Sequence, residues 1–158
     1  MKERSFNLEK EYENLKKKYN LPDFKKLNRE FDLEEIEHDG FLLRRIRTRL
    51  YDKVCSFIKI LESLLYPNGS DMASLHESKF FTEKDMNNVS SLFKKLMLID
   101  RYYLLVDLEE DEYKDSEFIN TVYEDWLILK KDLIKYLEIM KESWKGEDKM
   151  PTEKDYFG

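Results

Sequence analysis

Four of the seven arginines in this chain lie within six residues, Arg44, Arg45, Arg47 and Arg49. Arginine keeps its charge at physiological pH and presents a planar fork of donors that suits carboxylates and phosphates. On a helical wheel, Arg47 and Arg49 flank the apolar stripe of their segment, whereas Arg44 and Arg45 point outward or to one side. We therefore expect Arg47 and Arg49 to pair with acids of this chain, and Arg44 and Arg45 to stay exposed.

The charge around the cluster supports three interpretations. Residues 41–60 hold six basic residues against one acid, a net +5, and residues 107–117 hold seven acids against one lysine, a net −6. The first interpretation, which we favour, is that these segments and the acidic residues 30–39 complement one another within the fold. The second is recognition of an acidic protein partner by the arginines, and the third is binding of phosphate or nucleic acid.

A second group of residues has the types that bind metals. Glu35 and His38 have the E-x-x-H spacing of di-iron helical bundles, although those sites need two such motifs and further glutamates. Pairs of acids three residues apart also occur in magnesium-dependent nucleotide hydrolases. In a chain with 34 acids, chance alone supplies about seven such pairs. The candidate metal ligands are Glu34, Glu35, Glu37 and His38.

Three charged residues fall on the apolar faces of predicted helices, near their midpoints. They are Lys53, Asp100 and Lys130. One interpretation is a buried ionic layer that forms a site. The structural interpretation, which we favour, is that the lysines extend to water while Asp100 binds a tyrosine hydroxyl or an arginine such as Arg47.

The C-terminal tail, residues 147–158, lacks helical periodicity and ends with Tyr156 and Phe157 before the last glycine. Two aromatic residues are unusual in a polar tail. We expect them to dock on the chain's own helices or on a partner.

The elements that must position these residues are helices, because apolar residues recur at spacings of three and four. Asp32 with Glu35 and Thr82 with Asp85 have the spacing of N-terminal caps. The predicted helices cover residues 6–19, 22–31, 33–66, 72–79, 83–107 and 116–145, the third either running through Gly40 or restarting after it.

These helices predict an all-α fold, an antiparallel bundle of three long helices with shorter N-terminal helices packed across it. Residues 1–146 form a single predicted domain. The acidic stretch 107–115 is predicted to be the last connection, and Leu104 and Trp144 are predicted to face inward.

Composition narrows the classes of function. The net charge of −6 argues against non-specific binding to nucleic acid or to an anionic membrane, and no apolar run is long enough to span a bilayer. The glycines are isolated, so there is no phosphate-binding loop, and we expect no cofactor. Cys55 is the only cysteine, which excludes an internal disulfide, and the N-terminus lacks the apolar core of a signal peptide. We expect a cytoplasmic protein.

With no catalytic constellation and 14% aromatic residues, the sequence favours a non-enzymatic helical module for protein–protein interaction or self-association. Apolar residues that point away from the predicted core stripes support this hypothesis: Tyr102, Leu105, Ile128 and Ile139. The alternatives are a metal-dependent nucleotide or phosphoester hydrolase, and an accessory nucleic-acid-binding protein that uses the arginine cluster.

Overall fold

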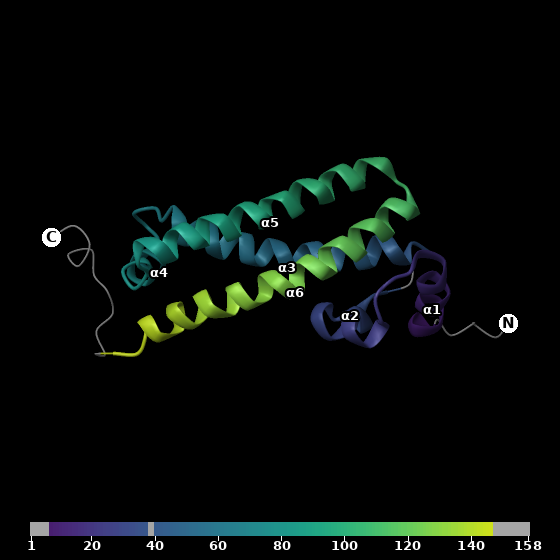
Figure 1. Cartoon of the computed structure of the whole chain (residues 1–158), viewed down its shortest axis with the longest axis horizontal. Helices are drawn as coiled ribbons and strands as arrows, with labels where there is room; N and C mark the ends of the chain where they lie inside the picture. The colour runs from purple at the N-terminus through teal and green to yellow at the C-terminus, as the bar shows by residue number, and fades with distance from the viewer. Residues whose placement is uncertain (1–6, 38–39, 147–158) are drawn as a thin grey trace. The chain divides into compact units, whose positions relative to one another are not determined.

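The computed structural model describes residues 7–37 and 40–146, and within these ranges the chain is all-α (Figure 1). The long helices α3, α5 and α6 pack against one another and the shorter helices precede them, which confirms the predicted fold class. The helices are α1 (Leu8–Tyr19), α2 (Phe24–Phe31), α3 (Leu42–Leu65), α4 (Met72–Ser78), α5 (Glu83–Glu109) and α6 (Glu112–Ser143), with a short 3-10 turn, η1, at Leu33–Glu35.

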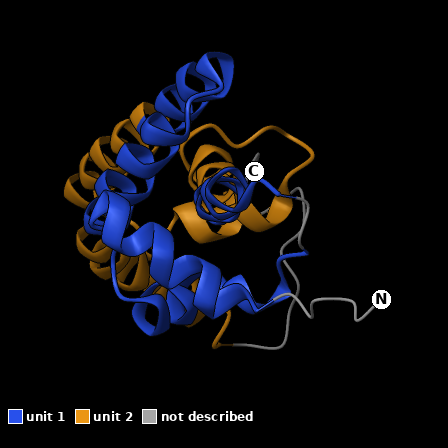
Figure 2. Ribbon diagram, turned by 90° about the vertical axis from the view of Figure 1, so that its right-hand side faces the viewer, with its two compact units in different colours: residues 1–54, 99–126 blue, residues 55–98, 127–158 orange. Residues whose placement is uncertain are grey.

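The chain divides into two compact units, coloured separately in Figure 2. Unit 1 comprises residues 1–54 and 99–126, and unit 2 comprises residues 55–98 and 127–158. Each long helix contributes one part to each unit, because the divisions fall within α3, α5 and α6.

Unit 1 contains α1, α2, the first half of α3 and the turn between α5 and α6. Asn20 ends α1 in the left-handed conformation, which asparagine adopts more readily than most residues. The chain then turns into α2, where the hydroxyl of buried Tyr12 donates to the carbonyl of Pro22 at 2.6 Å. The indole of Trp126 donates to Glu30 at 2.9 Å, which ties α2 to α6.

Helix α3 begins at Leu42, so the prediction that it starts at residue 33 was wrong and the restart after Gly40 is correct. Asp32 has a φ of 53° and ends α2, so it caps no helix with its side chain and the predicted Asp32–Glu35 capping box is absent. Gly40 has a φ of 88°, a conformation that glycine adopts without a steric penalty. This residue separates the η1 segment from α3.

The acidic stretch 107–115 is mostly helical, so its prediction as a connection was wrong. Helix α5 ends at Glu109 and α6 begins at Glu112, which leaves two residues for the turn. Glu110 occupies the left-handed region with a φ of 49°. Glu112 and Asp115 lie in the first turn of α6, where their charge is favourable to the helix dipole.

Helix α5 buries apolar positions at spacings of three, four and seven, and these set its phase: Val89, Leu92, Leu96, Ile99 and Val106. Leu104 lies off this stripe and is 46% exposed, which corrects its predicted inward position. In unit 2, Thr82 and Asp85 exchange backbone and side-chain hydrogen bonds of 3.0 and 3.2 Å, so the predicted cap at the start of α5 is confirmed.

The end of α6 corrects one further prediction. Trp144 is 44% exposed, and its ring lies 4.4 Å from that of His76, while its indole donates to Glu77 at 3.3 Å. His76 also reaches the carbonyl of Ser143 at 2.8 Å. Trp144 therefore covers α4 from outside instead of filling the core. Across the described ranges, every helix is too short or too polar to cross a membrane.

Candidate functional site

The arginine cluster separates into a buried member and outer members. Arg47 is 1% exposed, and its Nη2 donates to the Asp107 carboxylate at 2.9 Å. Its Nε lies 2.7 Å from Oδ1 of Asp115, an ion pair outside hydrogen-bond geometry. The guanidinium carbon lies 4.6 Å from the centre of the Tyr103 ring. These contacts confirm that Arg47 pairs internally.

Arg49 also pairs internally as predicted, because its Nη2 lies 2.8 Å from a carboxylate oxygen of Glu35. Together with the pairs of Arg47, this contact supports the interpretation that the basic and acidic segments complement one another within the fold. Arg45 is exposed. Arg44 is half-buried, so the prediction that it stays exposed was wrong: its guanidinium carbon lies 4.8 Å from the centre of the Phe41 ring.

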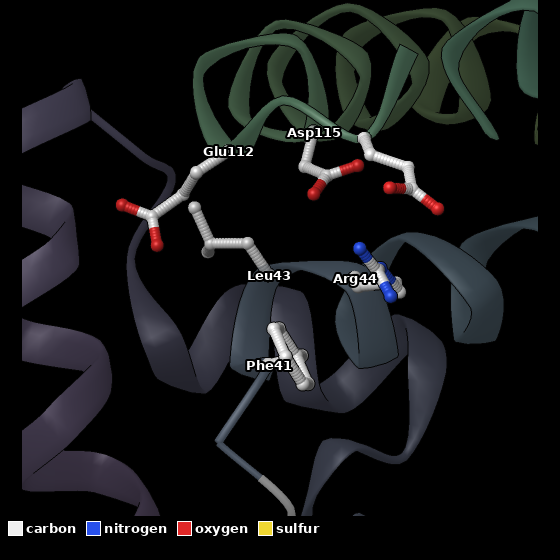
Figure 3. A pocket seen from close by; sticks show the side chains of 6 residues that line it. Phe41, Leu43, Arg44, Glu112 and Asp115 are labelled. Carbon is white, nitrogen blue, oxygen red and sulfur yellow. The ribbon is translucent and has the colours of Figure 1, made fainter. Parts of the chain in front are cut away.

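A pocket of about 160 Å³ opens beside Arg44, between the start of α3 and the turn from α5 to α6 (Figure 3). Its lining residues all belong to unit 1: Phe41, Leu43, Arg44, Glu110, Glu112 and Asp115. Helix α3 begins at Leu42, so Phe41 lies directly before the helix and Leu43 lies in its first turn. Figure 3 shows the carboxylate of Asp115 and the guanidinium of Arg44 pointing toward each other across it.

Asp115 links the pocket to the buried ion pair. The residue is 6% exposed, and its Oδ1 lies 2.7 Å from Nε of Arg47. Burial raises the pKa of this carboxyl, and the charges of Arg47 and Arg44 offset that increase only in part. In the described part of the chain, the buried side-chain atoms without a hydrogen-bond partner belong to Arg47 and are its Nε and Nη1.

The two glutamates of the pocket differ in their contacts. Glu112 accepts a hydrogen bond of 2.6 Å from the Tyr19 hydroxyl and lies 3.6 Å from Nζ of Lys18. Figure 3 shows its carboxylate turned away from the centre of the pocket. Glu110 is exposed and makes no hydrogen bond or ion pair through its carboxylate with any residue that the structure describes. Glu110 therefore differs from Glu112 and Asp115, each of which pairs with a basic residue.

The residues predicted to form an ionic layer are divided between the two units. Asp100 is 9% exposed and accepts a hydrogen bond of 2.8 Å from the Tyr51 hydroxyl, as the structural interpretation predicted. Its arginine partner is Arg101, the next residue, and not Arg47. Lys53 in unit 1 and Lys130 in unit 2 are each half-buried.

The candidate metal ligands are not assembled into a centre in the described ranges, which contain no group of three or more His, Cys, Asp or Glu side chains able to hold an ion. Glu34, Glu35 and Glu37 are exposed, and Glu35 pairs with Arg49. His38 lies outside the described residues. So do Tyr156 and Phe157, so their predicted docking stays a prediction.

Sequence reasoning identified Arg44 but missed Phe41 and Glu110 as parts of one pocket. The spacing of Phe41 and Arg44, three residues apart on a helix, is a signal that could have found the first pair. Glu110 was hidden among seven acids, because its distinguishing feature is a left-handed backbone at a two-residue turn.

No protein-family model matches this chain, and no curated protein or solved structure matches it either.

Proposed function

We propose that this chain is a non-enzymatic helical module that binds another protein or a second copy of itself. The observation that carries the proposal is a row of exposed leucines on α5. Leu104, Leu105 and Leu108 are 46%, 63% and 82% exposed, and we call them the α5 leucine row. Their spacing places them within about 100° of one another around the helix.

Several exposed apolar residues on one face of a helix indicate an interaction surface, whereas single exposed apolar residues are common on protein surfaces. Burying one leucine side chain fully is worth about 1.5–3 kcal/mol, so the row offers a partner a substantial driving force. Ile128 on α6 is exposed to a similar extent, 65%, but its helical neighbours at three and four residues are charged: Glu124, Asp125, Lys131 and Asp132. The row is therefore the stronger candidate surface.

Other predicted apolar positions contribute less. Tyr102 and Ile139 are half-buried, and the Tyr102 ring packs 5.1 Å from that of Phe118.

The lone Cys55, which is half-buried, fits a reducing compartment such as the cytoplasm, and we propose that location for the module.

Light scattering at several concentrations, combined with affinity capture of proteins from the source cells, tests the proposal. We expect the wild-type chain to self-associate or to capture a discrete partner. Leu105→Ser with Leu108→Ser should abolish that association, and Ile128→Ser should preserve it. A chain that stays monomeric and captures nothing that depends on the row would refute the proposal.

A further inference from the structure

An asparagine followed by a glycine occurs once in the chain, at Asn68 and Gly69. Both residues are exposed and lie between α3 and α4, within unit 2. The backbone nitrogen that follows an asparagine can attack the side-chain amide and close a five-membered ring, an intramolecular reaction that proximity favours. Glycine hinders this attack least, because it has no Cβ. The pair therefore has the residue types of a site that modifies itself.

Hydrogen bonds at Asn68 favour a reaction at its side-chain carbonyl. The Oδ1 atom accepts a hydrogen bond of 3.0 Å from the backbone N–H of Ser70 and another of 2.6 Å from the Ser70 hydroxyl. When the ring closes, negative charge develops on this oxygen, and donors that are already in place stabilise such a charge. Ser70 thus supplies two donors at the atom where the charge forms.

The atoms that must react or leave have no competing hydrogen bonds. The backbone nitrogen of Gly69 donates to no acceptor in the described part of the chain, so a base from solvent reaches its proton. The amide nitrogen of Asn68, Nδ2, likewise has no hydrogen-bond partner among the described residues. Its departure therefore breaks no contact of the fold.

The fold does not require glycine at position 69. Gly69 is not among the described residues with a positive φ, and a Cβ at this position would meet no neighbouring atom within 4 Å. Gly69→Ala is therefore compatible with both the backbone and the space of the turn. A change in reaction rate caused by this substitution reports on the chemistry and not on a disrupted fold.

We propose that Asn68 is a self-modification site at which the chain deamidates without an enzyme. Hydroxide removes the proton of the Gly69 nitrogen, and this nitrogen forms a bond to Cγ of Asn68 while an electron pair moves onto Oδ1. The electron pair then returns from Oδ1, and the bond between Cγ and Nδ2 breaks. Nδ2 takes a proton from water and leaves as ammonia, and the product is a succinimide.

Water opens the succinimide in one of two ways. Addition of water at Cγ breaks the bond to the Gly69 nitrogen and gives aspartate at position 68. Addition at the backbone carbonyl carbon gives isoaspartate, in which the main chain passes through Cβ. Each event consumes a water molecule, releases ammonia and adds a negative charge three residues before Asp71, whose carboxylate accepts from the N–H of Ser74 at the start of α4.

The test follows the full chain during incubation at neutral and mildly alkaline pH, with tryptic digestion under mildly acidic conditions and mass spectrometry. Peptide 60–79 contains Asn68 as its one asparagine. We expect it to convert to aspartate and isoaspartate, faster at higher pH because hydroxide removes the backbone proton. Peptide 85–94, with the exposed Asn87 and Asn88 of α5, is the internal control and should convert far more slowly. Conversion of Asn68 that is no faster than that of the control overturns the inference.

Two variants test the role of the turn. Gly69→Ala should slow the conversion by about tenfold or more, because its Cβ hinders ring closure. Ser70→Ala, at an exposed residue, removes the hydroxyl donor and should slow the conversion by about two- to tenfold in the folded chain. In urea, which abolishes the turn, Ser70→Ala and the wild type should agree within about twofold.

Thermal melts of both variants verify that they remain folded. An unchanged or faster conversion in either folded variant overturns the inference. So does a slowing by Ser70→Ala that is as large in urea as in the folded chain, because the hydrogen bonds of the turn would then have no part in the reaction.

Discussion

The two units of this molecule differ in the kind of polar group that they bury. Unit 1 buries three charged residues, Arg47, Asp100 and Asp115, whereas the described part of unit 2 buries two serines, Ser74 and Ser143, and no charged residue. Serine hydroxyls find a partner within their own helix or cap, and the hydroxyl of Ser143 donates to the carbonyl of Met140. A buried charge needs a partner of opposite charge, so unit 1 depends on specific pairs such as Arg47 with Asp115, and the described part of unit 2 buries no charge that requires one.

The buried charges also bear on where a binding surface lies. Burying charge is costly unless each charged group is fully paired, and in the described part of unit 1 the Nη1 of Arg47 is buried without a hydrogen-bond partner. The unit with the charged interior is also the unit with the leucine row and the acidic turn. We infer that unit 1 carries the binding surface and that unit 2 is stabilised chiefly by apolar packing.

The largest expected effect is at the buried arginine. Arg47→Met should lower the free energy of unfolding by about 3–5 kcal/mol, because it leaves Asp115 buried without its cation. Arg44→Ala should change it by about 0.5 kcal/mol or less, because Arg44 has no ion pair within 4 Å in the described ranges. Denaturant melts measure both. Equal losses of unfolding free energy in the two variants would show that the buried pair of Arg47 and Asp115 does not stabilise unit 1.

A smaller effect is expected at the second charged group of that interior. Tyr51→Phe removes the hydroxyl that donates to Asp100 but keeps a ring to stack on Tyr103 at 3.7 Å. It should cost about 1.5–3 kcal/mol, the range for a hydrogen bond to a charged group. Tyr113→Phe, at a tyrosine that is 54% exposed, is the matched control and should cost about 0.5 kcal/mol or less. Equal losses of unfolding free energy in Tyr51→Phe and Tyr113→Phe would show that the hydrogen bond from Tyr51 to Asp100 does not stabilise the fold.

The turn between α5 and α6 should respond in the opposite direction. Glu110→Gly should raise the free energy of unfolding by about 0.5–1 kcal/mol, because glycine adopts a φ of 49° without the strain of a Cβ. Glu109→Gly, one residue earlier in the last turn of α5, should lower it by up to about 1 kcal/mol. Thermal and urea melts of the two variants should move apart. A loss at Glu110 comparable to that at Glu109 would show that the left-handed turn is not strained.

The smallest expected effect is a pH dependence in unit 2. Burial raises the pKa of Glu77 above its ordinary value of 4.5, and the hydrogen bond from Trp144 offsets this only in part. The Glu77 carboxyl therefore binds its proton more tightly in the folded state than in the unfolded state. The stabilisation from this proton is fully present below the pKa of the unfolded state and is lost as the pH rises through the pKa of the folded state. Relative to Glu77→Gln, the wild-type chain should lose about 0.5 kcal/mol or less between about pH 4 and pH 7.

Glu142 is the natural control for this sign. Its pKa is lowered, chiefly by a hydrogen bond from Lys145, so its contribution is present at high pH and is lost as the pH falls through the folded pKa. Urea melts of Glu77→Gln and Glu142→Gln across this pH range should deviate from the wild type in opposite directions. Deviations of the same sign would contradict the assignment at Glu77.

The sequence predicted those features that depend on local pattern. The periodicity of apolar residues located the helices, the spacing of Thr82 and Asp85 identified a cap, and the wheel placed Arg47 at the border of the core. In each of these, one helix or one turn contains the whole signal, so no knowledge of neighbouring segments was needed.

The errors arose where the same residue type suits two structures. Acids favour both loops and the first turns of helices, so residues 107–115 were predicted as a connection although most of them are helical. Tyr103 and Leu104 are adjacent apolar residues, so the sequence alone does not show which of them faces the core. The buried positions of α5 set the phase of the helix, and in that phase Leu104 is exposed. The pocket could not be predicted, since it forms only where the start of α3 meets the turn between α5 and α6.

The most direct test of the central claim, that unit 1 carries a protein-binding surface, is site-specific photo-crosslinking in the source cells. A photoreactive amino acid replaces Leu105 in one experiment and Ile128 in another, two positions that are 63% and 65% exposed. We predict a discrete crosslinked protein from position 105 and none from position 128. Equal crosslinking at both positions, or a discrete product from position 128 alone, would contradict the account.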